Sequence, residues 1–346
     1  MSKAVLAAAS IVGLLPLLAA ASTFPLKRIP MLTYVVDYEA SWSPNGRQIV
    51  LISNRHGGMH VHVVAPVDAD HGSKMLQITN GDAEDDSPAW SPDGSEIAFV
   101  SVRRGASHIY VMNADGRNVR QVTTGSGQEI HPAWSPDGSR ILFDTTLFQQ
   151  TDRSGTPTAK PNDFIGETSD YAMDLATIRP DGTDLARITR GGGFTYASFS
   201  PDGRTILYRR QRRGESQIFV MGRNDLREHN LSGSFTSDGW PSWSPDGARI
   251  VFSRHLTNGF QIFVMNRDGS APQQLTDASG EFTNPRWSPT ERVFFAGEGG
   301  AAQSASCYSR PRELLRGFSP GRATWPWPAR TLDRSARRQH EARQAP

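Results

Sequence analysis

A five-residue motif, Trp-Ser-Pro-Asp-Gly, recurs along the chain and restricts the folds open to it. Its six copies begin at Trp42, Trp90, Trp134, Phe199, Trp243 and Trp287. The first copy has Asn in place of Asp, the fourth has Phe in place of Trp, and the last has lost the Asp-Gly pair. The aromatic residues are 48, 44, 65, 44 and 44 residues apart. A period in this range is typical of proteins built from repeated structural units.

Each repeat predicts four short strands. In the second repeat, Pro-Asp-Gly at residues 92–94 predicts a tight turn, because it combines a fixed φ, an Asx-type hydrogen bond and a residue that tolerates positive φ. Runs at residues 97–101, 109–112 and 120–123 predict the strands that follow. No stretch between the turns has the apolar period of an amphipathic helix. The predicted fold is therefore all-β: a six-bladed β-propeller of four-stranded antiparallel blades.

The repeat resembles the WD40-like (PD40) repeat of the TolB-type propellers. The resemblance is carried by Trp-Ser-Pro-Asp-Gly, by Ile-Tyr-Val-Met-Asn-x-Asp-Gly and by a final x-Leu-Thr, and it extends over residues 32–295. It implies the fold but no single activity, because similar blades occur in periplasmic adaptor proteins, in prolyl-oligopeptidase-like peptidases and in sugar-acid lyases. TolB itself has an α/β domain before its propeller. We expect that domain to be missing here, because only residues 26–31 separate the apolar N-terminus from the repeats.

The N-terminal region predicts an exported protein. Residues 1–21 have the basic start, apolar run and small residues of a cleavable signal peptide. An uncleaved membrane anchor is the alternative, because the run approaches spanning length. We expect residues 22–30 to be a linker and residues 31–295 to form the propeller. The protein is then secreted or periplasmic, with no stable membrane insertion after cleavage.

Two segments of the propeller depart from the regular repeat. Residues 149–169 are an insertion in blade three, polar and without periodicity, and a loop of this length is usually functional or disordered. Residues 31–35 contain the apolar-Thr pair that marks the fourth strand in other repeats. We predict that they form the outer strand of the last blade and so close the ring. A free N-terminal arm is the alternative.

The last blade loses its pattern. Residues 292–295 predict a strand, but no third strand is expected after them. Residues 296–346 contain nine arginines against four acidic residues and follow no period. We interpret this segment as a disordered tail that comes from a shifted reading frame or a degenerate terminus. A basic interaction tail is the functional alternative.

Alignment of the repeats identifies two sets of variable positions where each outer strand connects to the next inner strand. Three residues before each aromatic stand Glu39, Ser87, His131, Tyr196, Trp240 and Asn284. Five residues before it stand Asp37, Asp85, Glu129, Phe194, Asp238 and Phe282. We expect these connections at the mouth of the central channel, where loops on a rigid scaffold carry recognition. The candidate ligand-binding residues are Glu39, Asp85, Glu129, His131, Tyr196, Asp238, Trp240 and Asn284. The carboxylates are alternatively structural, turning the chain into the inner strand.

Conventional catalytic and cofactor signals are missing. The sequence has no His-Glu-x-x-His, P-loop or Cys/His metal spacing, so we predict no catalytic residue, no metal site and no cofactor. Clustered carboxylates at the mouth leave Ca²⁺ binding open. Outside the basic tail the net charge is −3, which does not favour nucleic-acid binding.

Two functions remain. The first is a monomeric scaffold, not an enzyme, that binds a protein partner or an envelope component at the channel mouth. The alternative is a carbohydrate- or peptide-active enzyme of the lyase type. In that case Glu39, His131 and Tyr196 are the acid–base set, and a metal held by Asp85, Glu129 and His131 would favour this reading.

Overall fold

The computed structural model describes the repeats and short pieces of both ends. The described residues are 27–28, 37–65, 75–103, 105–148, 173–190, 193–212, 215–233, 237–276, 280–299 and 308–310. The chain divides into two units, Met1–Arg312 and Glu313–Pro346, and every described residue belongs to the first. The expected signal peptide, the 149–169 insertion, the 31–35 strand and residues 311–346 of the tail lie outside the described residues.

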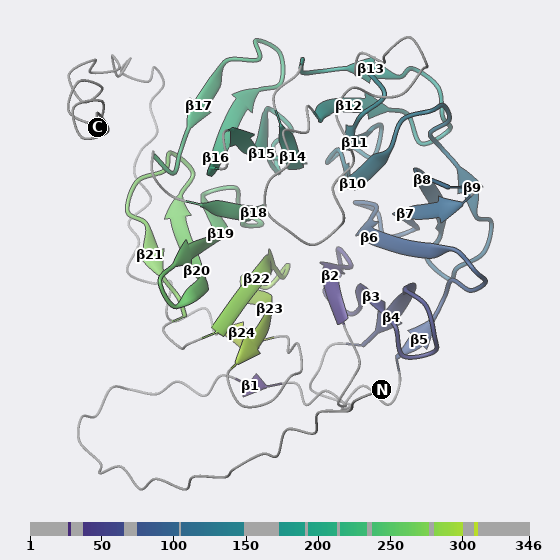
Figure 1. Cartoon of the computed structure of the whole chain (residues 1–346), viewed down its shortest axis with the longest axis horizontal. Coiled ribbons are helices and arrows are strands. Elements are labelled where there is room, and N and C mark those ends of the chain that lie inside the picture. Colours follow the sequence, from purple (N-terminus) through teal and green to yellow (C-terminus); the bar gives the residue numbers. More distant parts are fainter. Residues whose placement is uncertain are drawn as a thin grey trace, which may run out of the picture. The chain divides into compact units, whose positions relative to one another are not determined.

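The β-propeller fold predicted from the repeats is confirmed. The described strands form antiparallel four-stranded sheets, and in Figure 1 the first strand of each sheet lies nearest the centre of a ring. Blade 1 has β2 (Asp37–Trp42), β3 (Ile49–Ser53), β4 (His60–Val64) and β5 (Leu76–Gln77), and blade 2 has β6 (Glu84–Trp90), β7 (Glu96–Arg103), β8 (Ala106–Asn113) and β9 (Arg120–Gln121). None of the described residues forms a helix long and apolar enough to cross a membrane.

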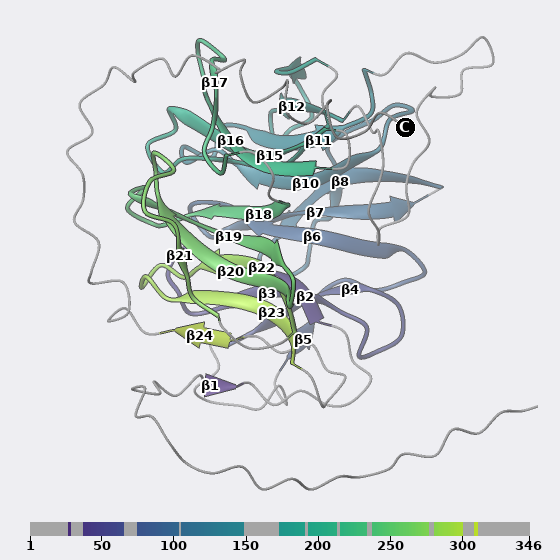
Figure 2. The same cartoon turned by 60° about the vertical axis from the view of Figure 1, so that its left-hand side comes forward.

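Blades 3 to 5 repeat this order. Blade 3 has β10 (Glu129–Trp134), β11 (Ile141–Thr145), β12 (Asp174–Ile178) and β13 (Ala186–Arg187), and blade 4 has β14 (Phe194–Phe199), β15 (Thr205–Arg212), β16 (Glu215–Gly222) and β17 (Glu228–Asn230). Blade 5 has β18 (Asp238–Trp243), β19 (Arg249–Leu256), β20 (Gly259–Asn266) and β21 (Gln273–Gln274). The sheets are stacked side by side around the ring, as the turned view in Figure 2 shows.

The sixth sheet combines both ends of the repeat region. Its order is β22 (Gly280–Trp287), β23 (Val293–Gly299), β24 (Tyr308–Arg310) and β1 (Lys27–Arg28). The expectation that no third strand follows residue 295 was therefore wrong, because β24 pairs with β23. An N-terminal strand does take the outer position, but it is β1, which precedes the segment that we predicted.

The repeated Ser-Pro-Asp-Gly motif forms a turn held by its own side chains. In the second copy, Ser91 Oγ donates to Asp93 Oδ1 over 2.6 Å and accepts from Glu96 N–H over 2.9 Å. Gly94 adopts φ +75°, which costs least in glycine. The glycine of each turn also lies against the proline of the preceding turn. The pairs are Gly94 with Pro44, Gly138 with Pro92, Gly203 with Pro136, Gly247 with Pro201, and Gly46 with Pro289.

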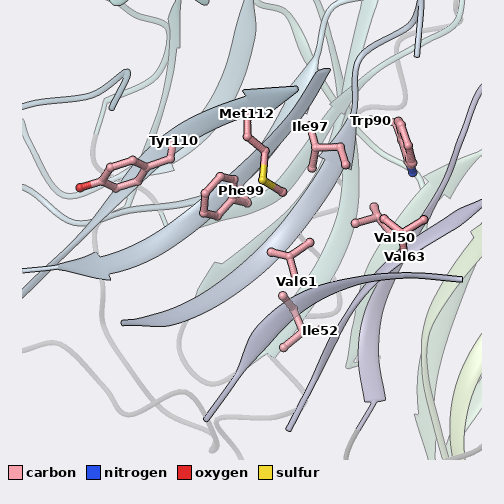
Figure 3. Packing of buried hydrophobic residues seen from close by; sticks show 9 residues of the cluster. All are labelled: Val50, Ile52, Val61, Val63, Trp90, Ile97, Phe99, Tyr110 and Met112. Carbon is pink, nitrogen blue, oxygen red and sulfur yellow. The ribbon is translucent and has the colours of Figure 1, made fainter. Parts of the chain in front are cut away.

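The core lies between neighbouring blades, and the two-residue period of the strands explains it. Ile97 and Phe99 of β7 pack on blade 1, whereas Ala98 and Val100 of the same strand pack toward blade 3. Figure 3 shows the first cluster, which contains Val50, Ile52, Val61, Val63, Trp90, Ile97, Phe99, Tyr110 and Met112. Burying each large apolar side chain contributes about 1.5–3 kcal/mol. Trp90 belongs to the cluster between blades 1 and 2, and Trp134 packs against the cluster between blades 2 and 3. The repeated tryptophans therefore pack between blades, as the sequence predicted.

The ring closes between blade 6 and blade 1. The Trp42 ring of β2 meets the Phe294 ring of β23 edge to face, with centroids 4.6 Å apart. Gly46 lies against Pro289, in the same pairing that links the other blades. The inner half of blade 6 thus makes regular inter-blade contacts, although its outermost strand, β1, comes from a distant part of the chain.

Candidate functional site

A β-bulge occurs at the same place in all six inner strands. The pairing of β10 with β11, for example, shifts register between Ile130 and Ala133, and the corresponding shift is present in the other five blades. In each bulge one non-glycine residue has positive φ: Glu39, Ser87, His131, Tyr196, Trp240 and Asn284, all between 48° and 54°. Such a conformation costs about 1–2 kcal/mol per residue. Bulges of this kind redirect a side chain next to a functional site.

Four of these six residues gather at the centre of the ring. The imidazole of His131 stacks on the Tyr196 ring with centroids 3.8 Å apart, and the Trp240 ring lies 5.9 Å beyond it. On the other side, His131 Nε2 is 3.9 Å from Glu39 Oε1. These residues belong to blades 1, 3, 4 and 5. The structure therefore brings together Glu39, His131 and Tyr196, which the sequence placed in one candidate set. Ser87 and Asn284 occupy the equivalent bulges of blades 2 and 6.

Asp144 orients the His131 imidazole from inside the protein. Its side chain is fully buried in β11, and Oδ2 accepts from His131 Nδ1 over 2.7 Å and from Tyr196 N–H over 3.0 Å. Burial raises the pKa of Asp144, and the hydrogen bond from His131 opposes this effect. One carboxyl thus ties the bulge of blade 3 to that of blade 4 and directs Nε2 toward Glu39.

A second buried carboxyl lies beside Glu39. Burial, the charge of Glu39 and a hydrogen bond with the Glu39 carboxyl hold the pKa of Asp86 well above its usual range. The buried guanidinium of Arg286, on β22, is the nearby cation. Its burial lowers its pKa, while the charge of Glu39 opposes that shift. The centre therefore combines two neighbouring carboxyl groups, a guanidinium and an oriented imidazole.

The second set of candidate residues lies in the interior and not at the mouth. Asp85, Glu129 and Asp238 are 2%, 1% and 0% exposed. Glu129 Oε2 accepts from His108 Nδ1 over 2.6 Å and from Thr123 Oγ1 over 3.0 Å, which joins blade 3 to blade 2. The corresponding Asp85 lies 3.6 Å from His60 of blade 1, and burial raises its pKa. Asp238 accepts two hydrogen bonds from the Arg254 guanidinium.

The buried contacts of this second set favour the structural alternative. Within the described residues, no group of three or more His, Cys, Asp or Glu side chains is placed to hold a metal ion. Asp85, Glu129 and His131 are therefore not among such a group, and a metal held by them was the observation that would have favoured the enzyme alternative.

Several residues of the site were not identified from the sequence. Asp144 and Arg209 occupy the same register position in blades 3 and 4, opposite Ile130 and Thr195. Arg209 lies over the Tyr196 ring, 5.0 Å from its centroid. In blades 1 and 2 this position holds Ile52 and Val100. The aligned repeats therefore contained a signal for both residues, because Asp144 and Arg209 are charged at a strand position that is apolar in blades 1 and 2.

The comparisons with known proteins agree with the fold. A family model described as the TolB β-propeller domain matches residues 33–153 and 164–294. None of the curated protein sequences matches the chain. Among solved structures, TolB from Acinetobacter baumannii is similar at 20% identity with a TM-score of 0.57. The alignment covers 73% of this chain and 57% of that one, so it spans just over half of the Acinetobacter protein.

Other similar structures differ in their described roles. A putative TolB from Agrobacterium tumefaciens is 21% identical with a TM-score of 0.57, over 81% of this chain and 92% of that one. An oligogalacturonate lyase from Vibrio parahaemolyticus is 13% identical with a TM-score of 0.52, over 83% and 94%. At these identities the similarity shows the fold and not an activity.

Proposed function

Because the chain belongs to the TolB β-propeller family, we propose that it is a secreted or periplasmic scaffold that binds a protein partner or envelope component at the centre of its ring. The binding face consists of the bulge residues Glu39, His131, Tyr196 and Trp240. Of the second set, Asp85 and Glu129 connect neighbouring blades and Asp238 pairs with Arg254 of its own blade, and we assign these carboxylates to the scaffold and not to binding.

The convergence of four different side chains from four blades carries this proposal. Glu39, His131, Tyr196 and Trp240 share one strained backbone conformation but carry different functional groups: a carboxyl, an imidazole, a phenol and an indole. Packing alone would be served by one residue type, as it is at the repeated tryptophans. Tyr and Trp are enriched at protein interfaces because they combine large apolar area with a polar group. A frame that holds chemically different residues at one backbone position is suited to recognition.

Site-specific photo-crosslinking in the intact cell tests the proposal. A photoreactive phenylalanine replaces Trp240 in one variant and Leu226 in the other. The two positions match, because both have positive φ, 50° and 51°. Leu226, however, lies just before the outer strand β17 of blade 4 and is 43% exposed. We expect a discrete crosslinked protein in the envelope fraction from position 240 only. Equal products from both positions, or no product from position 240, would contradict a binding face at the centre.

A further inference from the structure

We propose that the group bound at this site is the cationic amine of a partner, a lysine side chain or a chain N-terminus, seated between the Glu39 carboxylate and the His131 imidazole. This inference rests on the proposed function, because it names the chemistry recognised by the same site. Three observations carry it: the assigned proton on His131, the separation of two acceptors, and the side chains around them.

The hydrogen bonds assign the His131 proton. Asp144 Oδ2 accepts the backbone N–H of Tyr196 and lies 2.7 Å from His131 Nδ1, and an ionised Asp144, which has no proton to donate, accepts from Nδ1 as well. A neutral imidazole that donates from Nδ1 accepts at Nε2. Nε2 is directed toward Glu39, and the two atoms are 3.9 Å apart. That separation exceeds a hydrogen bond. Two acceptors that face each other in this way are satisfied together by one donor between them.

A primary amine fits that position. An ammonium group has three donors and no acceptor, so it can bond to Glu39 Oε1 and His131 Nε2 simultaneously. Blade 6, next to blade 1, contains a further acceptor without a partner among the described residues. Asn284 occupies the equivalent bulge, and its Oδ1 is buried without a hydrogen-bond partner in the described part of the chain.

Several charged and titratable groups face Glu39 and His131 and affect the binding of an amine. Glu39 faces the cation Arg286 and the carboxyl Asp86, with Tyr38 beside Asp86. His131 faces Asp144, whose charge Arg209 offsets. Arg286 opposes a second cation. The Glu39–Asp86 carboxyl pair favours one, because an added positive charge stabilises the charged forms of both carboxyl groups.

The test is an NMR titration of the full chain with ¹³Cε1-labelled histidine, with the His131 signal assigned from His131→Gln. The probes are Nα-acetyl-lysine amide and glycine amide, which carry the two kinds of amine. Nα-acetyl-norleucine amide, of similar size but uncharged, is the matched control probe. We expect saturable shifts of the His131 signal with one or both amines and none with the norleucine compound. Which amine binds more tightly distinguishes a side-chain source from a chain terminus.

Two variants test whether amine binding depends on the Glu39 side chain or only on the net charge of the protein. Glu39→Gln keeps the shape and is expected to weaken amine binding by at least about tenfold. Asp115→Asn also removes one negative charge, but in an exposed turn, and is expected to leave binding unchanged. Asn284→Asp is expected to tighten binding, which keeps the proposal testable if Glu39→Gln does not fold. Calorimetry of the wild type and the variants measures the dissociation constants of the amines.

Equal shifts with the norleucine compound, or unchanged amine binding in Glu39→Gln, would overturn the proposal. Its failure is distinguishable from failure of the proposed function. If the amines do not bind but position 240 still crosslinks a partner, the scaffold function stands and the amine does not. If the amines bind but no partner is crosslinked, the site exists without the proposed protein partner.

Discussion

At the scale of single residues, the aspartate of each Ser-Pro-Asp-Gly turn stabilises the fold through its charge. Asp93 Oδ1 accepts from Ser91 Oγ and from Ser95 N–H, and Asp137 has the same partners in the next blade. The Ser91 hydroxyl, followed by Ser95, lowers the pKa of Asp93 to about 2. Asp137 is shifted to the same value by Ser135 and Ser139. Hydrogen bonds to the charged form thus outweigh the effect of burial at both turns.

These shifts predict a loss of stability in acid. The folded pKa of Asp93 lies below the unfolded value of about 3.9. Its contribution is therefore fully present above that value and is lost as the pH falls toward about 2. Asp93→Asn should lower the urea midpoint at neutral pH, and its deficit relative to the wild type should shrink below pH of about 4. Urea titrations at several pH values measure this, with the exposed Asp115→Asn as the control. A deficit independent of pH would contradict the assignment.

The sequence predicted the positions of the site better than its geometry. Alignment of the repeats found His131, Tyr196 and Trp240, because each stands at a fixed distance before the motif. The left-handed backbone there was not predictable, since the six residues share no preference for positive φ. The burial of Asp85 and Glu129 was equally hidden, because an acidic residue in a connecting segment reads as exposed unless its partners on the neighbouring blade are known.

At the scale of strands and turns, the Asp-Gly turn between the third and fourth strands lies so close to the neighbouring blade that it requires a glycine. Gly116 of blade 2 lies so close to blade 1 that an added Cβ would be 2.6 Å from the Ile78 carbonyl oxygen. The equivalent Gly269 of blade 5 has the same relation to Leu231 of blade 4, at 2.5 Å. The turn therefore sets the spacing between neighbouring blades.

We predict that Gly116→Ala destabilises the protein much more than Gly57→Ala. Both glycines have φ +84°, so the backbone cost of about 1 kcal/mol is shared. A Cβ at Gly57 meets nothing within 4 Å, whereas at Gly116 it meets backbone of the next blade. The additional cost at Gly116 should be about 1–3 kcal/mol. Urea unfolding of both variants measures it, and equal losses would show that the close approach is not important.

The regular blades were predictable because turn residues and apolar runs recur at fixed spacing. Blade 6 was not, because β24 (Tyr308–Arg310) lacks the apolar pattern of the other third strands and is separated from β23 by eight residues. β24 is recognisable as the third strand of blade 6 only because it pairs with β23 on one side and with β1 on the other, and β1 lies far away in the sequence. Local sequence cannot supply such long-range pairing.

At the scale of the whole molecule, the ring is closed by unequal contacts. The inner part of blade 6 is joined to blade 1 by the Trp42–Phe294 pair and by Gly46 against Pro289. The outer part depends on β1, which makes only two residue pairs with β24. Closure should therefore depend mainly on packing near the axis.

Removal of β1 is predicted to weaken the protein without unfolding it. A chain that starts at residue 29 loses the two pairs of Lys27–Arg28 and should lose about 1–2 kcal/mol of stability. A chain that starts at residue 26 keeps β1 and serves as the control. The urea midpoints of the two chains measure the difference. Complete unfolding of the shorter chain would mean that the outer strand, and not the inner packing, closes the ring.

The six bulges also affect how such a protein can evolve. Glu, Ser, His, Tyr, Trp and Asn all occupy one backbone conformation, and none of them belongs to the turn or core that builds a blade. A mutation at one of these positions therefore changes what the centre can recognise while leaving the blade intact. New specificities can be acquired one residue at a time, without insertions and without an unfolded intermediate in the lineage.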